Sequence, residues 1–371
     1  MSDLFDYLDW RGDLSFEAVP FGKIDALLLS QISYLRLYNL VPYDFKESEA
    51  VRLCELAKSF KGASDYDFRT DLGPGINEKT PELLERASQT ERFKNVKACA
   101  LREKIDEENA EQFAAITYIL GKSAVVVFRG TDSSLVGWKE DCNIACLEEI
   151  PSQRDALLYC EAVFSSLKTD FILCGHSKGG NLAINSAVKC GAKSQKKISA
   201  IYNFDGPGFS KAFYKTEGFL KIEARLTNVY PYGSIVGMIF YHPEKYEIIK
   251  SNGVGAGQHD PFTWQIKGNT FIQRAEFSKE SKFFYTSLNN WIERMSTEEK
   301  QAFVNSVFEV IEASDYKSLN EIMNNLVPSS AKMIKKLSSM DKETREAIKN
   351  AIHNLHTCIK AEIPFLRVFE R

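Results

Sequence analysis

The stretch Gly175-His176-Ser177-Lys178-Gly179-Gly180 follows the apolar run Phe171-Ile172-Leu173-Cys174 and precedes a helix-forming run that begins at Asn181. It is a G-x-S-x-G sequence between a strand and a helix, where a serine is held in a sharp turn above the edge of a sheet. A Cβ atom at Gly175 or Gly179 would clash with neighbouring backbone in such a turn. The helix that starts after the serine points free N–H groups toward an anion. The stretch predicts a nucleophilic serine, and a glycine-rich loop that only turns the chain or holds a phosphate is the alternative.

The segments around this motif alternate between strand-like and helix-like patterns. Three β-type runs, at residues 96–105, 111–120 and 123–129, are separated by hairpin-like turns. The third run is apolar without alternation, as expected of a strand buried on both faces. Helical spacing then alternates with short apolar strands, with helices at 152–167 and 181–189 and strands at 169–174, 198–204, 226–230 and 246–251. Together with the serine turn, this pattern predicts an α/β-hydrolase fold, a mostly parallel central sheet flanked by helices.

Helical patterns flank this region on both sides. Residues 1–85 are expected to form an N-terminal helical segment that packs on the core, with helical spacing at 24–40 and 48–60. Residues 86–270 would form the α/β-hydrolase core. Residues 271–371 would form a C-terminal helical extension, in which Ser296-Thr297-Glu298-Glu299 is a capping-box signature. We expect the three parts to form one continuous structural unit.

A nucleophilic serine needs a base, and the chain has five histidines. His259 follows the last predicted strand, where this fold carries its base, and it comes after the serine in chain order. His242, beside a proline in a loop between strands, is the alternative. His176 lies inside the serine turn, at a position expected to point away from the face of the nucleophile. The remaining two histidines fall on a C-terminal amphipathic helix.

The third member of the site should be a carboxylate that orients the base and stabilises its charged form. The usual position, after the next-to-last strand, reads Tyr230-Pro231-Tyr232-Gly233-Ser234 and has no acid. One strand earlier, Asp205 ends a strand and precedes a tight turn, which makes it the favoured acid. Asp260 is the rival, although a residue adjacent to the base rarely reaches its ring. A turn-forming role for Asp205 is the plain alternative.

Two N–H donors are needed to hold an oxyanion. The backbone N–H of Lys178, directly after the nucleophile, is the first. The second is expected from Phe128-Arg129-Gly130-Thr131-Asp132, the turn that ends the strand at 123–129. Thr131 offers there both a backbone N–H and a hydroxyl.

The composition excludes several classes of protein. A net charge of −3 over 371 residues gives no reason to expect a nucleic-acid partner. The start of the chain does not resemble a secretory signal, and no apolar run is long enough for a transmembrane helix. Of the eight cysteines, only Cys142 and Cys146 are close together, and no second pair completes a zinc site. We therefore expect a cytoplasmic protein with reduced thiols, and neither a metal ion nor an organic cofactor.

The motifs resemble those of class 3 lipases, through the turn at Thr131 followed by Trp138 and Asp141 and through the serine turn. More closely, the chain resembles the bacterial Mbeg1-like group of α/β hydrolases, long grouped as a domain of unknown function. The stretches that match it lie at residues 6–16, 203–209, 234–238 and 258–264. This resemblance implies that Ser177 is the nucleophile, His259 the base and Thr131 an oxyanion donor. Class 3 lipases carry their acid near the position of Ser234, so the chain departs from them there.

These observations predict a serine hydrolase that cleaves carboxylic esters of a small molecule or a lipid through an acyl-enzyme. A thioesterase, an amidase or an acyltransferase would use the same residues, and a binding protein that kept the fold and lost turnover is the alternative of another class. Residues 133–155 or 206–225 could cover the site as a lid, or their aromatic residues could belong to the core. The sequence leaves the oligomeric state and the role of the C-terminal helices open.

Overall fold

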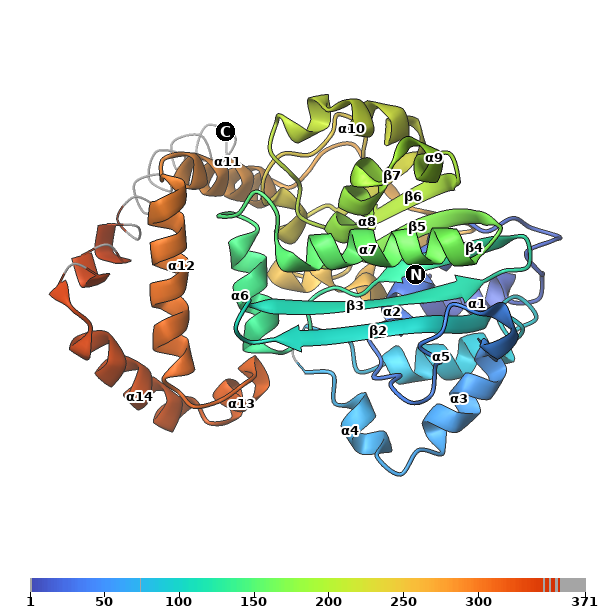
Figure 1. Cartoon of the computed structure of the whole chain (residues 1–371), viewed down its shortest axis with the longest axis horizontal. Helices are drawn as coiled ribbons and strands as arrows, with labels where there is room; N and C mark the ends of the chain where they lie inside the picture. The colour runs from blue at the N-terminus through green and yellow to red at the C-terminus, as the bar shows by residue number, and fades with distance from the viewer. Residues whose placement is uncertain (1, 74, 343, 347, 351–352, 354–371) are drawn as a thin grey trace.

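The computed structural model describes residues 2–73, 75–342, 344–346, 348–350 and 353 of the chain. Its centre is a nine-stranded sheet in the order β1-β2-β3-β4-β5-β6-β7-β8-β11 (Figure 1). The strands are β1 (Val51–Arg52), β2 (Lys97–Asp106), β3 (Glu111–Ile119), β4 (Ser123–Phe128), β5 (Asp170–His176), β6 (Ile198–Phe204), β7 (Leu226–Pro231), β8 (Glu247–Ile249) and β11 (Gln273–Arg274). A separate pair, β9 (Ile266–Lys267) and β10 (Thr270–Phe271), lies outside this sheet.

The sheet combines an antiparallel and a parallel half. Strands β1 to β4 pair antiparallel, and the predicted hairpins β2–β3 and β3–β4 are both present. From β4 to β8 all neighbours are parallel, and β11 closes the edge antiparallel to β8. The parallel strands are joined through helices, as α/β crossovers require. The predicted α/β-hydrolase fold, with its mostly parallel central sheet, is confirmed.

The position of β4 in the sheet explains why its sequence is apolar without alternation. Val125 and Val127 pack into the core shared with the N-terminal helices, and Val126 and Phe128 pack into the core on the opposite face. Successive side chains of a strand point to opposite faces, so a strand covered on both sides needs apolar residues at every position. Both faces of the sheet are therefore buried.

The N-terminal helices α1 (Leu4–Arg11), α2 (Lys23–Ile32), α3 (Leu53–Lys61), α4 (Tyr66–Thr70) and α5 (Thr80–Gln89) lie on one side of the sheet, and α7 (Pro151–Ser166) and α8 (Lys178–Lys189) lie on the other (Figure 1). The short helices α9 (Ala192–Gln195) and α10 (Glu217–Ile222) pack beside α8. These two layers of helices hold the ends of the parallel strands in place.

Two N-terminal expectations differ from the structure. The helix expected over 24–40 ends at Ile32, and beyond it the carbonyl groups of Arg36 and Tyr38 accept hydrogen bonds from the guanidinium of Arg69, at 2.6 and 3.1 Å. The helix expected over 48–60 begins only at Leu53. The residues before it form β1, which pairs with the edge of β2. Tertiary hydrogen bonds override the local helical pattern in both places.

The chain ends in helices α11 (Lys279–Glu293), α12 (Thr297–Glu312), α13 (Leu319–Asn324) and α14 (Leu326–Ser339). The predicted capping box is present, since the Ser296 Oγ accepts from the backbone N–H of Glu299 while the Glu299 carboxylate accepts from the N–H of Ser296. Helix α6 (Leu135–Asn143) lies between α12 and the sheet (Figure 1). Within the described residues, none of the helices combines the length and apolar character needed to span a bilayer.

Candidate active site

Ser177 stands in the turn between β5 and α8, with φ 58° and ψ −135°. This backbone conformation is rarely adopted by residues other than glycine. Close packing around the turn explains its two flanking glycines. A Cβ at Gly175 would lie 2.3 Å from the backbone of Gly179, and a Cβ at Gly179 would lie 2.0 Å from the carbonyl oxygen of Phe128. The strained conformation of Ser177 is therefore fixed by backbone packing on both sides.

His259 ends the short 3-10 helix Gly255–His259, and its ring is held by a buried carboxylate. The His259 Nδ1 lies 2.7 Å from Oδ2 of Asp205, a fully buried residue directly after β6. The other oxygen, Oδ1, accepts the hydroxyl of buried Ser234 at 2.5 Å. Burial raises the pKa of Asp205, and the hydrogen bonds from His259 and Ser234 oppose that rise. Both carboxylate oxygens are thus used, one by the histidine and one by the serine.

The two alternatives weighed from the sequence lie elsewhere. Asp260 caps the following turn, since its Oδ1 accepts from the N–H of Phe262 at 3.0 Å and its Oδ2 accepts from the amide of Asn77 at 2.6 Å. His242 is packed among aromatic rings, including Tyr230 at 5.3 Å between centroids, and burial lowers its pKa to about 4. The Asp260 carboxylate and the His242 ring therefore each have a structural role of their own, although Asp260 directly follows His259 in the chain.

His176 lies against His259 instead of facing away from the site as we expected. The two rings pack against each other with their planes tilted by 33° and their centroids 4.4 Å apart, and the Nε2 of His176 is 2.9 Å from the backbone carbonyl oxygen of His259. Because a carbonyl only accepts, Nε2 carries the proton and Nδ1 accepts from the hydroxyl of Tyr34 at 3.0 Å. Burial and the neighbouring His259 hold the pKa of His176 well below its usual value. The ring of neutral His176 therefore packs against the ring of His259.

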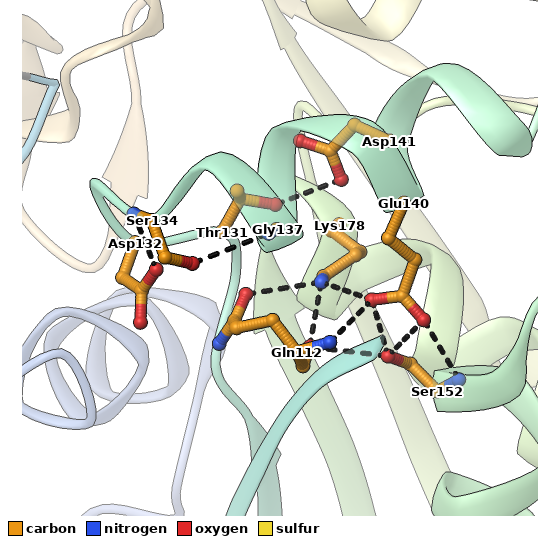
Figure 2. Close-up of polar contacts among 9 residues, drawn as sticks. All are labelled: Gln112, Thr131, Asp132, Ser134, Gly137, Glu140, Asp141, Ser152 and Lys178. Atoms are coloured by element: carbon orange, nitrogen blue, oxygen red, sulfur yellow. Dashed lines mark hydrogen bonds and ion pairs between the residues drawn. The ribbon is translucent and has the colours of Figure 1, made fainter. Parts of the chain in front are cut away.

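The turn after β4 touches the serine directly. A Cβ placed on Gly130 would lie 3.1 Å from the Cβ of Ser177, so Thr131 follows a residue that packs on the serine. The Thr131 hydroxyl donates to Oδ1 of Asp141 on α6 at 2.8 Å (Figure 2). Burial raises the pKa of Asp141 to about 6, although the Lys178 charge and the Thr131 hydroxyl act in the opposite direction. With its hydroxyl proton directed to Asp141, Thr131 is left with its backbone N–H as a donor.

The side chain of Lys178 is buried in a polar cluster that the sequence did not indicate. Its ammonium lies 2.7 Å from Oε2 of Glu140 on α6, and 2.7 and 3.0 Å from the carbonyl and side-chain oxygens of Gln112 on β3 (Figure 2). The Glu140 carboxylate also accepts from the backbone N–H and hydroxyl of Ser152 at the start of α7. The only sequence signal was a lysine directly after the serine, which says nothing of its partner. The cluster ties α8, β3, α6 and α7 together beside the turn of Ser177.

A cavity of about 330 Å³ opens beside these residues. Ser177, His259, His176 and Thr131 all line it, and so does Asp141. No hydrogen bond joins the Ser177 hydroxyl to the His259 ring among the described residues, a contact that is often long until substrate binds. Of the predicted site residues, Lys178 also lines this cavity, whereas Asp205 is buried and joined to it through its hydrogen bond with His259.

The two segments considered as lids differ in their relation to this cavity. Helix α6 and the residues after it, within 133–155, form part of the cavity wall. The aromatic residues of 206–225 stack on one another and belong to the core below α8, with the rings of Phe209 and Phe213 3.9 Å apart. Only Pro207 of that segment reaches the cavity.

Among the described residues, no group of three or more His, Cys, Asp or Glu side chains could hold a metal ion. The cysteines that the structure describes are free thiols. Burial raises the pKa of the cavity-lining Cys146 to about 11, so this thiol is neutral. Cys358, also expected to be reduced, lies outside the described residues.

Comparison with known proteins identifies the family of the chain. Similar solved structures include the Rhizomucor miehei lipase propeptide complex, with 16% identity over 47% of this chain and 70% of that one and a TM-score of 0.31. The crystal structure of M37 lipase is also similar, with 17% identity over 57% of this chain and 68% of that one and a TM-score of 0.31. No curated protein matches the chain. The profile of the Mbeg1-like family matches residues 87–309, more than half of the sequence, and the chain therefore belongs to the Mbeg1-like family.

Proposed function

We propose that the protein is a serine hydrolase that cleaves carboxylic esters through an acyl-enzyme, with Ser177 as nucleophile, His259 as base and Asp205 as the acid. The observation that carries this proposal is the 2.7 Å hydrogen bond between Asp205 and His259, at the end of a cavity that also holds the strained Ser177. A nucleophile, a base and a buried group that orients the base are the parts that acyl transfer needs.

The tautomer of His259 follows from its partner. Asp205 is an acceptor when ionised, so the His259 proton sits on Nδ1 and leaves Nε2 free to take the proton of the Ser177 hydroxyl. The serine oxygen then attacks the ester carbonyl carbon and forms a tetrahedral intermediate. Asp205 stabilises the imidazolium that results, at a site where neutral His176 adds no competing charge.

The negative charge of the intermediate falls on the former carbonyl oxygen. The backbone N–H of Lys178, at the start of α8, and that of Thr131, in the turn packed on Ser177, are the proposed donors to it. His259 then gives its proton to the leaving alcohol, and the bond from the carbonyl carbon to the alcohol oxygen breaks. Water repeats the sequence on the acyl-enzyme and releases the acid.

Labelling with a fluorophosphonate probe, together with hydrolysis of p-nitrophenyl butyrate, tests this proposal. The wild type should label and turn over, whereas Ser177→Ala should do neither and His259→Ala should lose turnover by several orders of magnitude. Ser165→Ala, on the exposed side of α7, is the matched serine control and should behave as wild type. His242→Phe is the histidine control and should keep its activity.

Three other results would each overturn a part of this proposal. A wild type that neither labels nor hydrolyses the ester would support the binding-protein interpretation. Labelling without ester turnover would overturn the ester assignment and direct attention to thioesters and amides. Loss of turnover in His242→Phe with activity kept in His259→Ala would overturn the choice of base.

A further inference from the structure

The walls of the cavity divide into a polar end and an apolar body. The reacting end carries Ser177, His259, Thr131 and Asp141. The body is formed by side chains from the end of α6 and from the C-terminal helices α11 and α12, which are almost entirely apolar. An apolar pocket with a few polar groups at one end is the usual form of a site for a small ligand with a long apolar part.

The C-terminal helices α11 and α12 form one side of this apolar part of the cavity. The rings of Trp291 on α11 and Phe303 on α12 contact each other, with centroids 5.4 Å apart. Next to Phe303, the side chain of Val304 is buried in a cluster with Cys146, which follows α6. Helix α12 and the segment after α6 therefore pack against each other and form one wall of the cavity. Because the Cys146 thiol is neutral, this wall remains apolar.

We propose that this chamber, bounded by α6, α11 and α12, binds the alkyl chain of the acyl group, and that the extent of its apolar walls selects esters of medium-length acyl chains. This inference rests on the proposed ester hydrolysis. It also gives the C-terminal helices a role, as the wall that sets the length of the chain.

The direction of the chamber favours the acyl part of the ester over the alcohol. The leaving alcohol must take its proton from His259, so it lies on the side of that residue. Helix α6 begins shortly after Thr131, on the side of the proposed oxyanion donors. We therefore expect the wall formed by α6 to lie beside the acyl part of the ester.

The size of the chamber limits the chain. The cavity is about 330 Å³, and part of that space lies at the reacting end. We expect octanoate and decanoate to lie within its apolar walls, and palmitate to extend beyond them.

The test is a series of p-nitrophenyl esters from acetate to palmitate, in which the leaving group is constant. For the wild type, kcat/KM should rise to a maximum at about eight to ten carbons and then fall. Ala145→Phe fills the chamber and should lower the ratio of kcat/KM for octanoate over acetate by tenfold or more. Ala302→Phe makes the same change on an exposed position of α12 and should keep the wild-type ratio.

Val304→Ala enlarges the chamber at the wall formed by α12 and should move the maximum to a longer chain, which keeps the inference testable if Ala145→Phe fails to fold. A wild type that hydrolyses acetate but shows no dependence on acyl length, or an unchanged ratio in folded Ala145→Phe, would overturn the chamber and leave the hydrolase standing. A length dependence found only in acetate esters of longer alcohols would also overturn it. A wild type inactive on every ester would overturn both proposals.

Discussion

Ser234 donates its hydroxyl to Oδ1 of Asp205, the carboxylate oxygen that His259 leaves free. Asp205, the proposed acid, follows β6, and Ser234 follows the neighbouring strand β7. The carboxylate therefore lies between the histidine and a hydroxyl that comes from the next strand. This relationship makes two substitutions informative.

Asp205→Asn should lower kcat by about 10⁴-fold. The amide NH₂ group can donate to Nδ1 of His259, and this favours the tautomer in which Nε2 carries the proton and cannot accept the one from Ser177. Ser234→Ala should have a smaller effect on kcat. The Ser234 hydrogen bond lowers the pKa of Asp205, so its loss raises that pKa and moves the acidic limb of kcat upward in pH. A pH profile of p-nitrophenyl butyrate hydrolysis measures both. If Asp205→Asn keeps more than a tenth of the activity, the acid lies elsewhere.

The buried ion pair of Lys178 and Glu140 gives a second prediction. Both side chains are almost fully buried, with exposures of 1% and 0%. Lys178→Met should lower the free energy of unfolding by about 3–5 kcal/mol, because the Glu140 charge remains buried without its partner. The double variant Lys178→Met, Glu140→Leu should recover much of that loss.

Urea denaturation of the two single variants and the double variant measures this coupling. Lys61→Met, at the exposed pair with Glu85, is the control and should leave the unfolding free energy nearly unchanged. Additive losses across the cycle would show that Lys178 and Glu140 do not stabilise each other.

Local patterns predicted the strands from β2 to β8 well, because each has an apolar run, whereas the two-residue strands β1 and β11 lie where helices were expected. The strand expected over 198–204 has those bounds in β6, and the buried run before Arg129 is β4. The serine turn was equally predictable, since its glycines are required by backbone packing within a few residues. Features that depend on neighbouring residues in the sequence could therefore be predicted from it.

Contacts between distant segments were not predictable in this way. Glu140 and Lys178 are 38 positions apart and meet only because α6 folds back over β3. His176 was expected to face away from the serine, yet the approach of the loop at His259 turns it into a neighbour of that ring. Sequence spacing gives no information on where one loop lies against another.

The charge of Asp141 should make stability depend on pH. Burial raises its folded-state pKa from 3.8 to about 6, so the folded protein disfavours the ionised form. This cost is absent below about pH 4, where Asp141 is protonated in both states, and it is complete above about pH 6. Asp141→Asn keeps an oxygen for the Thr131 hydroxyl and removes the charge.

The variant should therefore unfold at nearly the wild-type temperature at pH 4 and at a higher temperature at pH 8, with a gain of at most about 3 kcal/mol. Thermal melts across this range measure the difference. A gain that is equal at both pH values would show that the Asp141 charge is not its cause.

The backbone of Ser177 supplies the last prediction, which separates strain from chemistry. With φ at 58° and ψ at −135°, a residue with a Cβ is held in a conformation that costs about 1–3 kcal/mol. Ser177→Ala and Ser177→Gly both remove the proposed nucleophile, but only glycine adopts this conformation without that cost. Ser177→Gly should therefore be more stable than Ser177→Ala, by about 1 kcal/mol after the greater freedom of glycine in the unfolded chain is included.

Denaturation of the two inactive variants measures this order of stability. Ser186, inside α8, is the matched control, because its backbone is helical and glycine should there be less stable than alanine by about 1 kcal/mol. If glycine is the more stable substitution at Ser177 and the less stable one at Ser186, the strain lies at Ser177 itself. If glycine is the less stable substitution at both, the turn holds Ser177 without strain, and the rigidity of the site comes from the packing of Gly175 and Gly179 alone.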